Sequence, residues 1–429
     1  MQEKYKVLIV GSGGREHAFT WKISLSDKVE TIFVAPGNAG TSQEHKTTNI
    51  DISPNDIPAL IQFSKDEQIN LVIVGPEDPL VNGITDQFAA EGINCFGPSA
   101  TAAQLEGSKD YSKAFMQKYQ IPTADYSSFE NVMEAKRYIE SKTYPLVIKA
   151  DGLAAGKGVV IVENYESAVK TIDEFMDKEK YGQAGKKIII EEFLVGQELS
   201  FIVIVNGKEV LPLATSQDHK TIGEGDVGLN TGGMGAFSPV PFVNKKLHER
   251  ILNKVIIPTV NGLHSEGIHY RGFLYAGLMI DENLEPKVLE YNCRFGDPET
   301  QPIMMRLNSD LIDLIDTSFK GGIDKFPIKW NPNTALGVIM SSKGYPEQYA
   351  TGQEISGLSH FNNEQNLKVF HSGTTLDNDK ILTSGGRVLC VTALGSDIET
   401  SKALAYSAVS KINWEGCYCR KDIGYRVIK

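Results

Sequence analysis

A glycine-rich segment with two lysines is the first part of the sequence that could do phosphate chemistry. It runs from Lys149 to Gly158, reads Lys-Ala-Asp-Gly-Leu-Ala-Ala-Gly-Lys-Gly, and has β-type apolar runs on both sides. A P-loop has four residues between its glycines, Ser or Thr after its lysine, and a helix behind it. Here three residues separate Gly152 from Gly156, and a glycine follows Lys157. The segment therefore predicts the tip of a β-hairpin, which either folds over phosphates or is a flexible tip with two solvated lysines.

The second candidate feature is an apolar strand that runs into acidic residues. Residues 188–190 are followed by Glu191, then by Phe193 and Leu194, with Glu198 a few positions on. Backbone groups at the end of such a strand could read the edge of an adenine, while apolar side chains sandwich its ring and a carboxylate holds ribose hydroxyls. The alternative is that the two glutamates are only the solvated end of a buried strand.

The third feature places a carboxylate and an amide on one strand. Residues 287–292 read Lys-Val-Leu-Glu-Tyr-Asn. Because side chains alternate along a strand, Val288, Glu290 and Asn292 are expected on one face. The oxygens of Glu290 and Asn292 are hard ligands that suit Mg²⁺, which usually keeps phosphate and water oxygens as well. Arg294 follows closely and could meet a phosphoryl group. The alternative is an exposed Glu/Asn pair with an arginine partner.

The elements that must position these residues begin with a regular pattern. The first hundred residues alternate between short apolar runs and helical stretches, which predicts a parallel sheet with right-handed crossovers. Each expected strand ends in a loop of small residues, and ligands of open α/β sheets bind at that edge. The expected strands are residues 6–10, 31–35, 71–75 and 93–97, and the expected helices are residues 16–26, 56–66 and 81–91.

The first of these loops reads Gly-Ser-Gly-Gly over residues 11–14. A glycine-rich turn after a strand offers free N–H groups to a phosphate. A dinucleotide-binding turn is the rival interpretation, but the third glycine of that motif is missing at the expected spacing and Arg15 intrudes. We therefore rank nicotinamide binding low.

The rest of the chain is expected to form two further parts, with a boundary near residues 326–332. Residues 101–120 read as one helix. Further helices are expected at residues 129–141, 167–177 and 398–412, and strands at 145–150, 159–162, 187–190, 200–205, 273–280 and 287–291. The predicted domains are an N-terminal α/β domain (1–103), a central domain (104–328) with a lid of about 123–190, and a β-rich C-terminal domain (329–429).

The composition excludes some classes of function. The chain has 43 basic and 54 acidic residues and a net charge of -11, so its average field repels nucleic acid. No apolar run approaches the roughly 20 residues of a membrane span, and the apolar run near the N-terminus is too short for a signal peptide. The five scattered cysteines suit reduced thiols, so we expect a cytoplasmic protein.

Together the three features resemble the ATP-grasp superfamily, and longer motifs resemble one family within it, the phosphoribosylamine–glycine ligases. The motifs occur in order from residue 11 to residue 426, so the resemblance covers essentially the whole chain. It implies an α/β and α+β multidomain protein with an N-terminal parallel-sheet domain, a central ATP-grasp fold and a β-rich C-terminal domain. The motifs lie at residues 13–18, 34–40, 74–77, 104–109, 149–158, 216–220, 230–236, 292–300 and 420–426.

The resemblance implies that glycine is joined to 5-phosphoribosylamine, with ATP as co-substrate and glycyl phosphate as intermediate, in de novo purine biosynthesis. Its products would be glycinamide ribonucleotide, ADP and phosphate. The implied phosphoribosylamine pocket is Gly11, Gly13, Gly14, Arg15, Asn38 and Glu77. The implied ATP site is Lys109, Lys149, Gly156, Lys157, Gly158, Glu191, Phe193, Leu194 and Glu198. Mg²⁺ or Mn²⁺ would be held by Glu290 and Asn292. The implied catalytic set is Lys149, Asp218, Lys220, Arg294 and Asp297.

Two other functions stay open at this point. A related ATP-grasp ligase or carboxylase could act on another carboxylate, and a non-catalytic regulator could keep the nucleotide site. Such a regulator has no need of Lys149, Glu290, Asn292 and Arg294 together, so their joint presence favours catalysis. The expected strand at 273–280 carries no carboxylate, which favours one metal ion over two. The expected partners are the small substrates, without nucleic acid or membrane, in a monomer or weak dimer.

Overall fold

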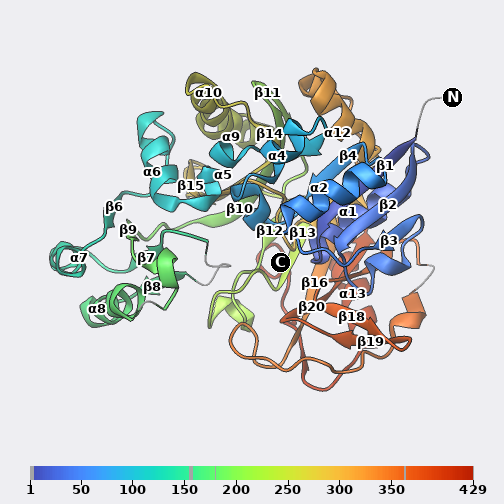
Figure 1. Ribbon diagram of the computed structural model, residues 1–429. Helices are drawn as coiled ribbons and strands as arrows, with labels where there is room; N and C mark the ends of the chain where they lie inside the picture. Colours follow the sequence, from blue (N-terminus) through green and yellow to red (C-terminus); the bar gives the residue numbers. More distant parts are fainter. Residues whose placement is uncertain (1–3, 154–157, 179, 362–363, 429) are drawn as a thin grey trace.

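The computed structural model describes residues 4–153, 158–178, 180–361 and 364–428. The chain forms an N-terminal sheet, a lid, a central sheet and a C-terminal sheet (Figure 1). All four parts contribute residues to one cavity. The predicted fold class is thereby confirmed, while the domain limits at residues 103 and 328 stay predictions.

The N-terminal sheet has five parallel strands in the order β3-β2-β1-β4-β5. The strands are β1 (Tyr5–Gly11), β2 (Val29–Pro36), β3 (Thr47–Asn49), β4 (Leu71–Val74) and β5 (Cys95–Phe96). Its helices are α1 (Gly14–Ser24), α2 (Ile57–Asp66), α3 (Glu77–Val81) and α4 (Ile84–Ala90). The strand–helix alternation predicts this sheet correctly except for the edge strand β3, whose Thr-Thr-Asn sequence lacks an apolar run.

The single helix predicted over residues 101–120 is wrong, because the chain forms α5 (Ala100–Gly107) and α6 (Lys109–Lys118). Ser108 separates them with φ -135° and ψ 117°, and its hydroxyl caps α6 by accepting the Tyr111 N–H. The break places Lys109 at the first position of α6, where its ammonium donates to the Gly152 carbonyl at 3.0 Å. The sequence signal for the break was the Gly-Ser pair at 107–108.

The lid is a four-stranded antiparallel sheet in the order β6-β9-β7-β8, and it projects to one side of the molecule (Figure 1). Its elements are β6 (Tyr126–Phe129), α7 (Val132–Ile139), β7 (Leu146–Ala150), β8 (Val159–Val162), α8 (Tyr165–Ile172) and β9 (Ile188–Glu192). Lys149 pairs with Val159 across β7 and β8, so the predicted hairpin is confirmed. Gly156 and Lys157 lie outside the described residues.

The central sheet has the order β11-β10-β14-β15 and is antiparallel. Its strands are β10 (Gln197–Asn206), β11 (Glu209–Pro212), β14 (Arg271–Ile280) and β15 (Pro286–Asn292). The accompanying helices are α9 (Lys245–Ile251), α10 (Ile257–Ser265), α11 (Thr300–Arg306) and α12 (Leu311–Lys320).

The C-terminal sheet takes two strands from the middle of the chain. Its order is β12-β13-β16-β20-β17, and β21 pairs with β16. The strands are β12 (Gln217–Asp218), β13 (Gly235–Ser238), β16 (Thr334–Ser342), β17 (Leu367–His371), β20 (Arg387–Gly395) and β21 (Cys417–Tyr418). A hairpin of β18 (Thr374–Asp377) and β19 (Lys380–Thr383) and the helix α13 (Ile398–Val409) complete this part. The segment with Asp218 and Lys220 therefore starts on a strand of the C-terminal sheet.

One hydrophobic core runs through the N-terminal, central and C-terminal sheets, whereas the lid has a smaller core of its own. An aromatic cluster lies where the first two sheets meet. The ring centroid of Phe273 on β14 lies 5.6 Å from that of Phe19, 4.9 Å from that of Phe96 and 4.8 Å from that of Phe295. The cluster packs the N-terminal sheet against the central sheet. Among the described residues, no helix combines the length and apolar character needed to cross a bilayer.

We expect Phe273→Ala to lower the free energy of unfolding by about 3–5 kcal/mol, because it removes a buried ring and leaves a cavity among three others. Urea unfolding followed by tryptophan fluorescence measures the change. Leu376→Ala is the control, since Leu376 is 47% exposed and its loss should cost under about 0.5 kcal/mol. Equal costs for the two variants would contradict the proposed role of the cluster.

Candidate active site

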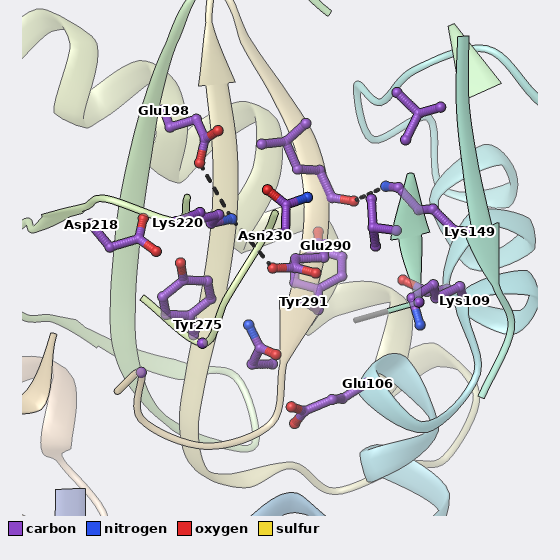
Figure 2. Close-up of a pocket in the computed structure, with 18 of the residues that line it drawn as sticks. Glu106, Lys109, Lys149, Glu198, Asp218, Lys220, Asn230, Tyr275, Glu290 and Tyr291 are labelled. Carbon is purple, nitrogen blue, oxygen red and sulfur yellow. Dashed lines mark hydrogen bonds and ion pairs between the residues drawn. The ribbon is translucent and has the colours of Figure 1, made fainter. Parts of the chain in front are cut away.

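A cavity of about 430 Å³ lies between the lid, the central sheet and the segment after β12 (Figure 2). Polar side chains from all of these elements point into it, so sequence positions far apart meet at one site. The predicted site residues that line it are Arg15, Glu77, Lys109, Lys149, Gly158, Glu191, Phe193, Leu194, Glu198, Asp218, Lys220, Glu290, Asn292, Arg294 and Asp297.

The pair predicted to bind a metal ion, Glu290 and Asn292, lies on β15, but one part of the prediction for this strand is wrong. A β-bulge interrupts the pairing, so that Leu278 pairs with Val288 and Gly277 with Glu290. The extra residue between them turns Val288 to the opposite face, where it is fully buried, while Glu290 and Asn292 line the cavity. A Cβ on Gly277 would come within 3.3 Å of the Glu290 side chain, so glycine gives this carboxylate its room.

Lys220 lies between two carboxylates at the centre of the cavity (Figure 2). Its ammonium is 3.3 Å from Glu198 and 3.6 Å from Glu290. Burial opposes the charged form of Lys220, but these two carboxylates and Asp218 outweigh it and raise its pKa well above the ordinary value. The pKa of Glu290 is shifted in the opposite direction. Burial opposes its charge, but Lys220, Lys149 and Lys109 outweigh this effect and lower its pKa. Both groups are therefore charged near neutral pH.

A second buried ion cluster joins the lid to α6. The Glu191 carboxylate is 3.0 Å from the Lys149 ammonium and 3.2 Å from that of Lys113, and all three side chains are less than 10% exposed. Lys149 also donates to the Leu289 carbonyl on β15 at 3.1 Å. Burial, despite the nearby Glu191, lowers the pKa of Lys113 to about 8. The second carboxylate oxygen of Glu191 has no partner among the described residues, so this end of the cavity can accept a further donor.

Lys113 was not among the predicted site residues, because its only sequence signal is a lysine on an amphipathic helix. Glu106 was not among them either, although it lies within the motif at residues 104–109. Its carboxylate accepts the Cys293 N–H at 2.7 Å and lies 2.9 Å from the Arg294 guanidinium. Arg294 also contacts Glu77 at 3.2 Å, so one arginine holds two carboxylates.

The pKa values of the two carboxyl groups beside Arg294 are shifted in opposite directions. Burial raises the pKa of Glu106 to about 7 in spite of Arg294, and the charge of Glu77 adds to this shift. Burial acts in the same sense on Glu77, but Arg294 and Arg15 outweigh it and lower the pKa of Glu77 to about 2. The pKa of Glu77 thus lies far below neutral pH, whereas that of Glu106 lies near it.

The side chain of Glu16 lies against the glycine-rich loop at residues 11–14. The Glu16 carboxylate accepts the Gly13 N–H at 2.5 Å, and a Cβ on Gly75 would come within 1.9 Å of it. Arg15 follows this loop and lines the cavity, whereas Gly11, Gly13 and Gly14 do not. At least the Gly13 N–H is therefore taken in this structure, and the predicted phosphate role of the loop stays a prediction.

Asn38 also stays outside the cavity lining. Its amide nitrogen donates to the carbonyls of Ser12 and His371, and its oxygen accepts the N–H groups of Gly40 and Thr41. This side chain ties the N-terminal loops to the C-terminal sheet. Its predicted contact with a substrate is not tested by these bonds.

Asp218 and Asp297 both line the cavity. Burial raises the pKa of Asp218 to about 8, against the nearby Lys220. Burial acts in the same sense on Asp297, but Arg387 and Arg15 outweigh it and lower its pKa. The Arg15 N–H donates to Asp297 at 3.3 Å and the Gln301 amide donates at 2.9 Å. Asp297 is thus a fixed anion, whereas Asp218 can gain or lose a proton.

Two hydroxyl groups and one carboxylate form a buried hydrogen-bonded group in the wall of the cavity. The Ser200 hydroxyl on β10 donates to the Glu299 carboxylate at 2.9 Å and lies 3.0 Å from the Tyr275 hydroxyl on β14. All three side chains are buried. Glu299 and Tyr275 line the cavity but carried no sequence signal beyond their motif and strand.

The lid above a central antiparallel sheet, with lysines and carboxylates between them, defines an ATP-grasp protein. A solved biotin carboxylase from Campylobacter jejuni has a similar fold, with a TM-score of 0.75 at 16% identity over 97% of this chain and 93% of that chain. The family described as phosphoribosylglycinamide synthetase matches in three segments: its N domain at residues 5–106, its ATP-grasp (A) domain at 107–300 and its C domain at 335–426. The chain belongs to this family.

Individual relatives agree with this assignment over nearly the full length. The phosphoribosylamine–glycine ligase of Vibrio cholerae is 52% identical over 99% of this chain and 98% of its own length. That of Escherichia coli K12 is also 52% identical, over 99% of both chains. The crystal structure of the Thermotoga maritima phosphoribosylamine–glycine ligase matches with a TM-score of 0.84 at 33% identity, over 98% of this chain and 100% of that chain. The predicted family is confirmed.

The buried Glu106 predicts a pH dependence of stability. Its folded pKa of about 7 lies above the ordinary 4.5, so its stabilising contribution is full below pH 4.5 and is lost as the pH rises through 7. At about 1.4 kcal/mol per pKa unit, the loss is roughly 3 kcal/mol. The stability of the wild type minus that of Glu106→Gln should fall by this amount between those two pH values, as measured by urea unfolding.

The matched control is Glu163→Gln, which changes an exposed glutamate of the lid. Its difference from the wild type should stay constant with pH. A constant difference for Glu106→Gln as well would show that burial does not perturb this carboxyl group.

Proposed function

We propose that the chain joins glycine to 5-phosphoribosylamine and converts ATP to ADP and phosphate, giving glycinamide ribonucleotide in purine biosynthesis. The observation that carries the proposal is the family match over the whole chain, together with one cavity that holds every described residue of the predicted ATP, metal and catalytic sets. Its cytoplasmic location and its state as a monomer or weak dimer are predictions that accompany this proposal.

The first step is attack of a glycine carboxylate oxygen on the γ-phosphorus of ATP, which forms glycyl phosphate and releases ADP. The amine of phosphoribosylamine then attacks the acyl carbon, phosphate leaves, and the nitrogen gives up a proton. Little covalent work falls to the protein, so positioning and electrostatics carry the rate. The lid excludes water that would hydrolyse the acyl phosphate.

The residues divide between these tasks. Lys109 and Lys149 hold the phosphates of ATP, with Gly156, Lys157 and Gly158 in the closing hairpin tip. Glu191, Phe193, Leu194 and Glu198 hold the adenosine. Gly11, Gly13, Gly14, Arg15, Asn38 and Glu77 form the phosphoribosylamine pocket. Arg294, Lys220, Asp218 and Asp297 surround the reacting carboxylate and amine. Asp218 is the group assigned to the amine proton, which its charged form accepts; because burial raises its pKa to about 8, this form prevails above that pH.

The chemistry of β15 fits a divalent cation. Glu290 is charged, its side chain is 38% exposed to the cavity, and the Asn292 amide lies on the same face. Together they would hold Mg²⁺ or Mn²⁺, which supplies positive charge to the phosphoryl group during transfer. Lys220 pairs with both Glu290 and Glu198, so it would keep Glu198 as a partner beside a bound cation.

The reaction is tested by omitting each substrate in turn. We expect ADP release with Mg²⁺, glycine and phosphoribosylamine generated in the assay, and no release without any one of them. ADP release that is independent of glycine would point to another carboxylate substrate. ATP binding without turnover under any condition would favour a non-catalytic nucleotide-binding protein.

The metal assignment is tested with Glu290→Gln, which keeps the shape and removes the charge. We expect the turnover number for glycine-dependent ADP formation to fall by at least about 100-fold at saturating ATP and Mg²⁺. Glu282→Gln is the matched control, because Glu282 is exposed in the turn that joins β14 to β15. Turnover of Glu290→Gln at the control rate would refute the role of Glu290.

A further inference from the structure

The last residues of the chain pack against the segment that carries Asp218 and Lys220. This segment, residues 218–235, folds back on itself: the Thr231 N–H donates to the Lys220 carbonyl at 2.7 Å, and the Met234 N–H donates to the His219 carbonyl at 2.7 Å. The C-terminal residues 418–426 run alongside it. We call the first segment the catalytic loop and the second the C-terminal tail.

Asp226 of the catalytic loop receives three side chains of the C-terminal tail. Arg420 contacts it at 3.0 Å, the Tyr425 hydroxyl donates at 2.5 Å, and the Arg426 guanidinium donates twice to one of its oxygens. Burial opposes the charge of Asp226, but these donors outweigh it and lower its pKa to about 2. The carboxylate is therefore charged at any physiological pH and anchors the tail.

Further contacts join the two segments along their length. Arg420, whose side chain is fully buried, donates to the Thr221 carbonyl at 3.1 Å. Asp422 accepts the Gly225 N–H at 2.8 Å, and the Gly424 N–H donates to the His219 ring at 3.1 Å. Burial lowers the pKa of His219 to about 3, so its ring is neutral and can accept this bond.

Arg426 is the member of the tail that reaches the catalytic end of the loop. Besides its bonds to Asp226, its guanidinium donates to the Asp218 carbonyl at 3.3 Å. Arg426 is not part of the cavity lining, so among the described residues it acts on the cavity only through its neighbours. One rigid planar group thus links the anchor Asp226 to the backbone of a residue that lines the cavity.

We propose that Arg426, anchored by Asp226, is a positioning residue that fixes Asp218 and the adjoining Lys220 for the step between the acyl phosphate and the amine. This inference rests on the proposed function. The residues assigned to ATP lie on the lid, α6 and β10, and among the described residues no hydrogen bond or ion pair joins the tail to them. Loss of Arg426 should therefore slow turnover and leave ATP binding in place.

A shift of the pH profile adds a second signature. The charged and titratable groups around Asp218 are Lys220 of the catalytic loop, Glu198 of β10, Tyr275 of β14, Glu299 at the start of α11, and Arg426. Lys220 and Arg426 favour its charged form, and the two glutamates oppose it. Removal of the Arg426 charge raises the pKa of Asp218 further, so the acidic limb of the kcat profile should move to higher pH.

The test compares Arg426→Gln with Arg426→Lys and with the control Lys421→Gln, which removes one charge from an exposed side chain of the same tail. Steady-state ADP release gives kcat and the KM for ATP and for glycine. We expect Arg426→Gln to lower kcat by about 10- to 100-fold, with the KM for ATP changed by less than about twofold. Arg426→Lys should fall between it and the wild type, and Lys421→Gln should match the wild type.

Several outcomes would overturn the inference. They are a wild-type kcat in Arg426→Gln, a KM for ATP that rises in proportion to the loss of kcat, or an unmoved pH profile. If Arg426→Gln does not fold, Arg426→Lys decides alone: reduced kcat with an unchanged KM for ATP supports the role, and wild-type kcat refutes it. Failure of the proposed function is distinguishable, because the wild type itself would then show no glycine-dependent ADP release.

Discussion

The site depends on one electrostatic constraint, namely that several lysines and carboxylates share one small, largely buried cavity. Lys220 is shared between Glu198 and Glu290, and Lys149 is held by Glu191. A buried charge without a partner costs several kcal/mol, so each lysine needs its carboxylate. The pairs therefore allow charges of both signs to lie close together in a cavity with little access to solvent.

The same constraint explains why the backbone around β15 is irregular. Glu290 must reach the centre of the cavity while Val288, two residues earlier, must enter the hydrophobic core. A regular strand would put both on one face, and the bulge between them separates the two demands. Gly277 on the neighbouring strand has no side chain, which leaves room for the side chain of Glu290. A local departure from regular pairing thus lets a core strand direct a carboxylate into the cavity.

Much of the fold was predictable because its signals are local. Alternating apolar runs and helical stretches predict the N-terminal parallel sheet, and glycines flanked by two strands predict the lid hairpin. The break at Ser108 has only a weak local signal, the Gly-Ser pair at 107–108, and the bulge before Glu290 has none, so neither was predicted. Ser108 ends one helix beside Asp151, which accepts its hydroxyl at 3.1 Å from 43 residues away. Nothing in the local pattern of residues 101–120 shows that partner.

The site residues divide in the same way. Residues at strand ends or in glycine-rich motifs, such as Glu290 and Lys149, were predicted because their chemistry and position coincide. Lys113 and Glu106 were missed because each lies on a helix whose sequence looks structural. Their function as partners of Glu191 and Arg294 follows only from tertiary contacts. Identity of residue type cannot distinguish a buried partner from a solvated one.

The path of the chain connects the C-terminal sheet directly to residues that line the cavity. β12 and β13 leave the central part of the sequence, join the sheet of β16 and β20, and return, so the catalytic loop between them starts and ends on the C-terminal sheet. The tail then closes over that loop from the same side. Both ends of the loop and the tail that covers it are thus tied to the C-terminal sheet, the tail through the pairing of β21 with β16. The lid carries Lys149 on a part of the chain with a hydrophobic core of its own, so the two sides of the site rest on separate cores.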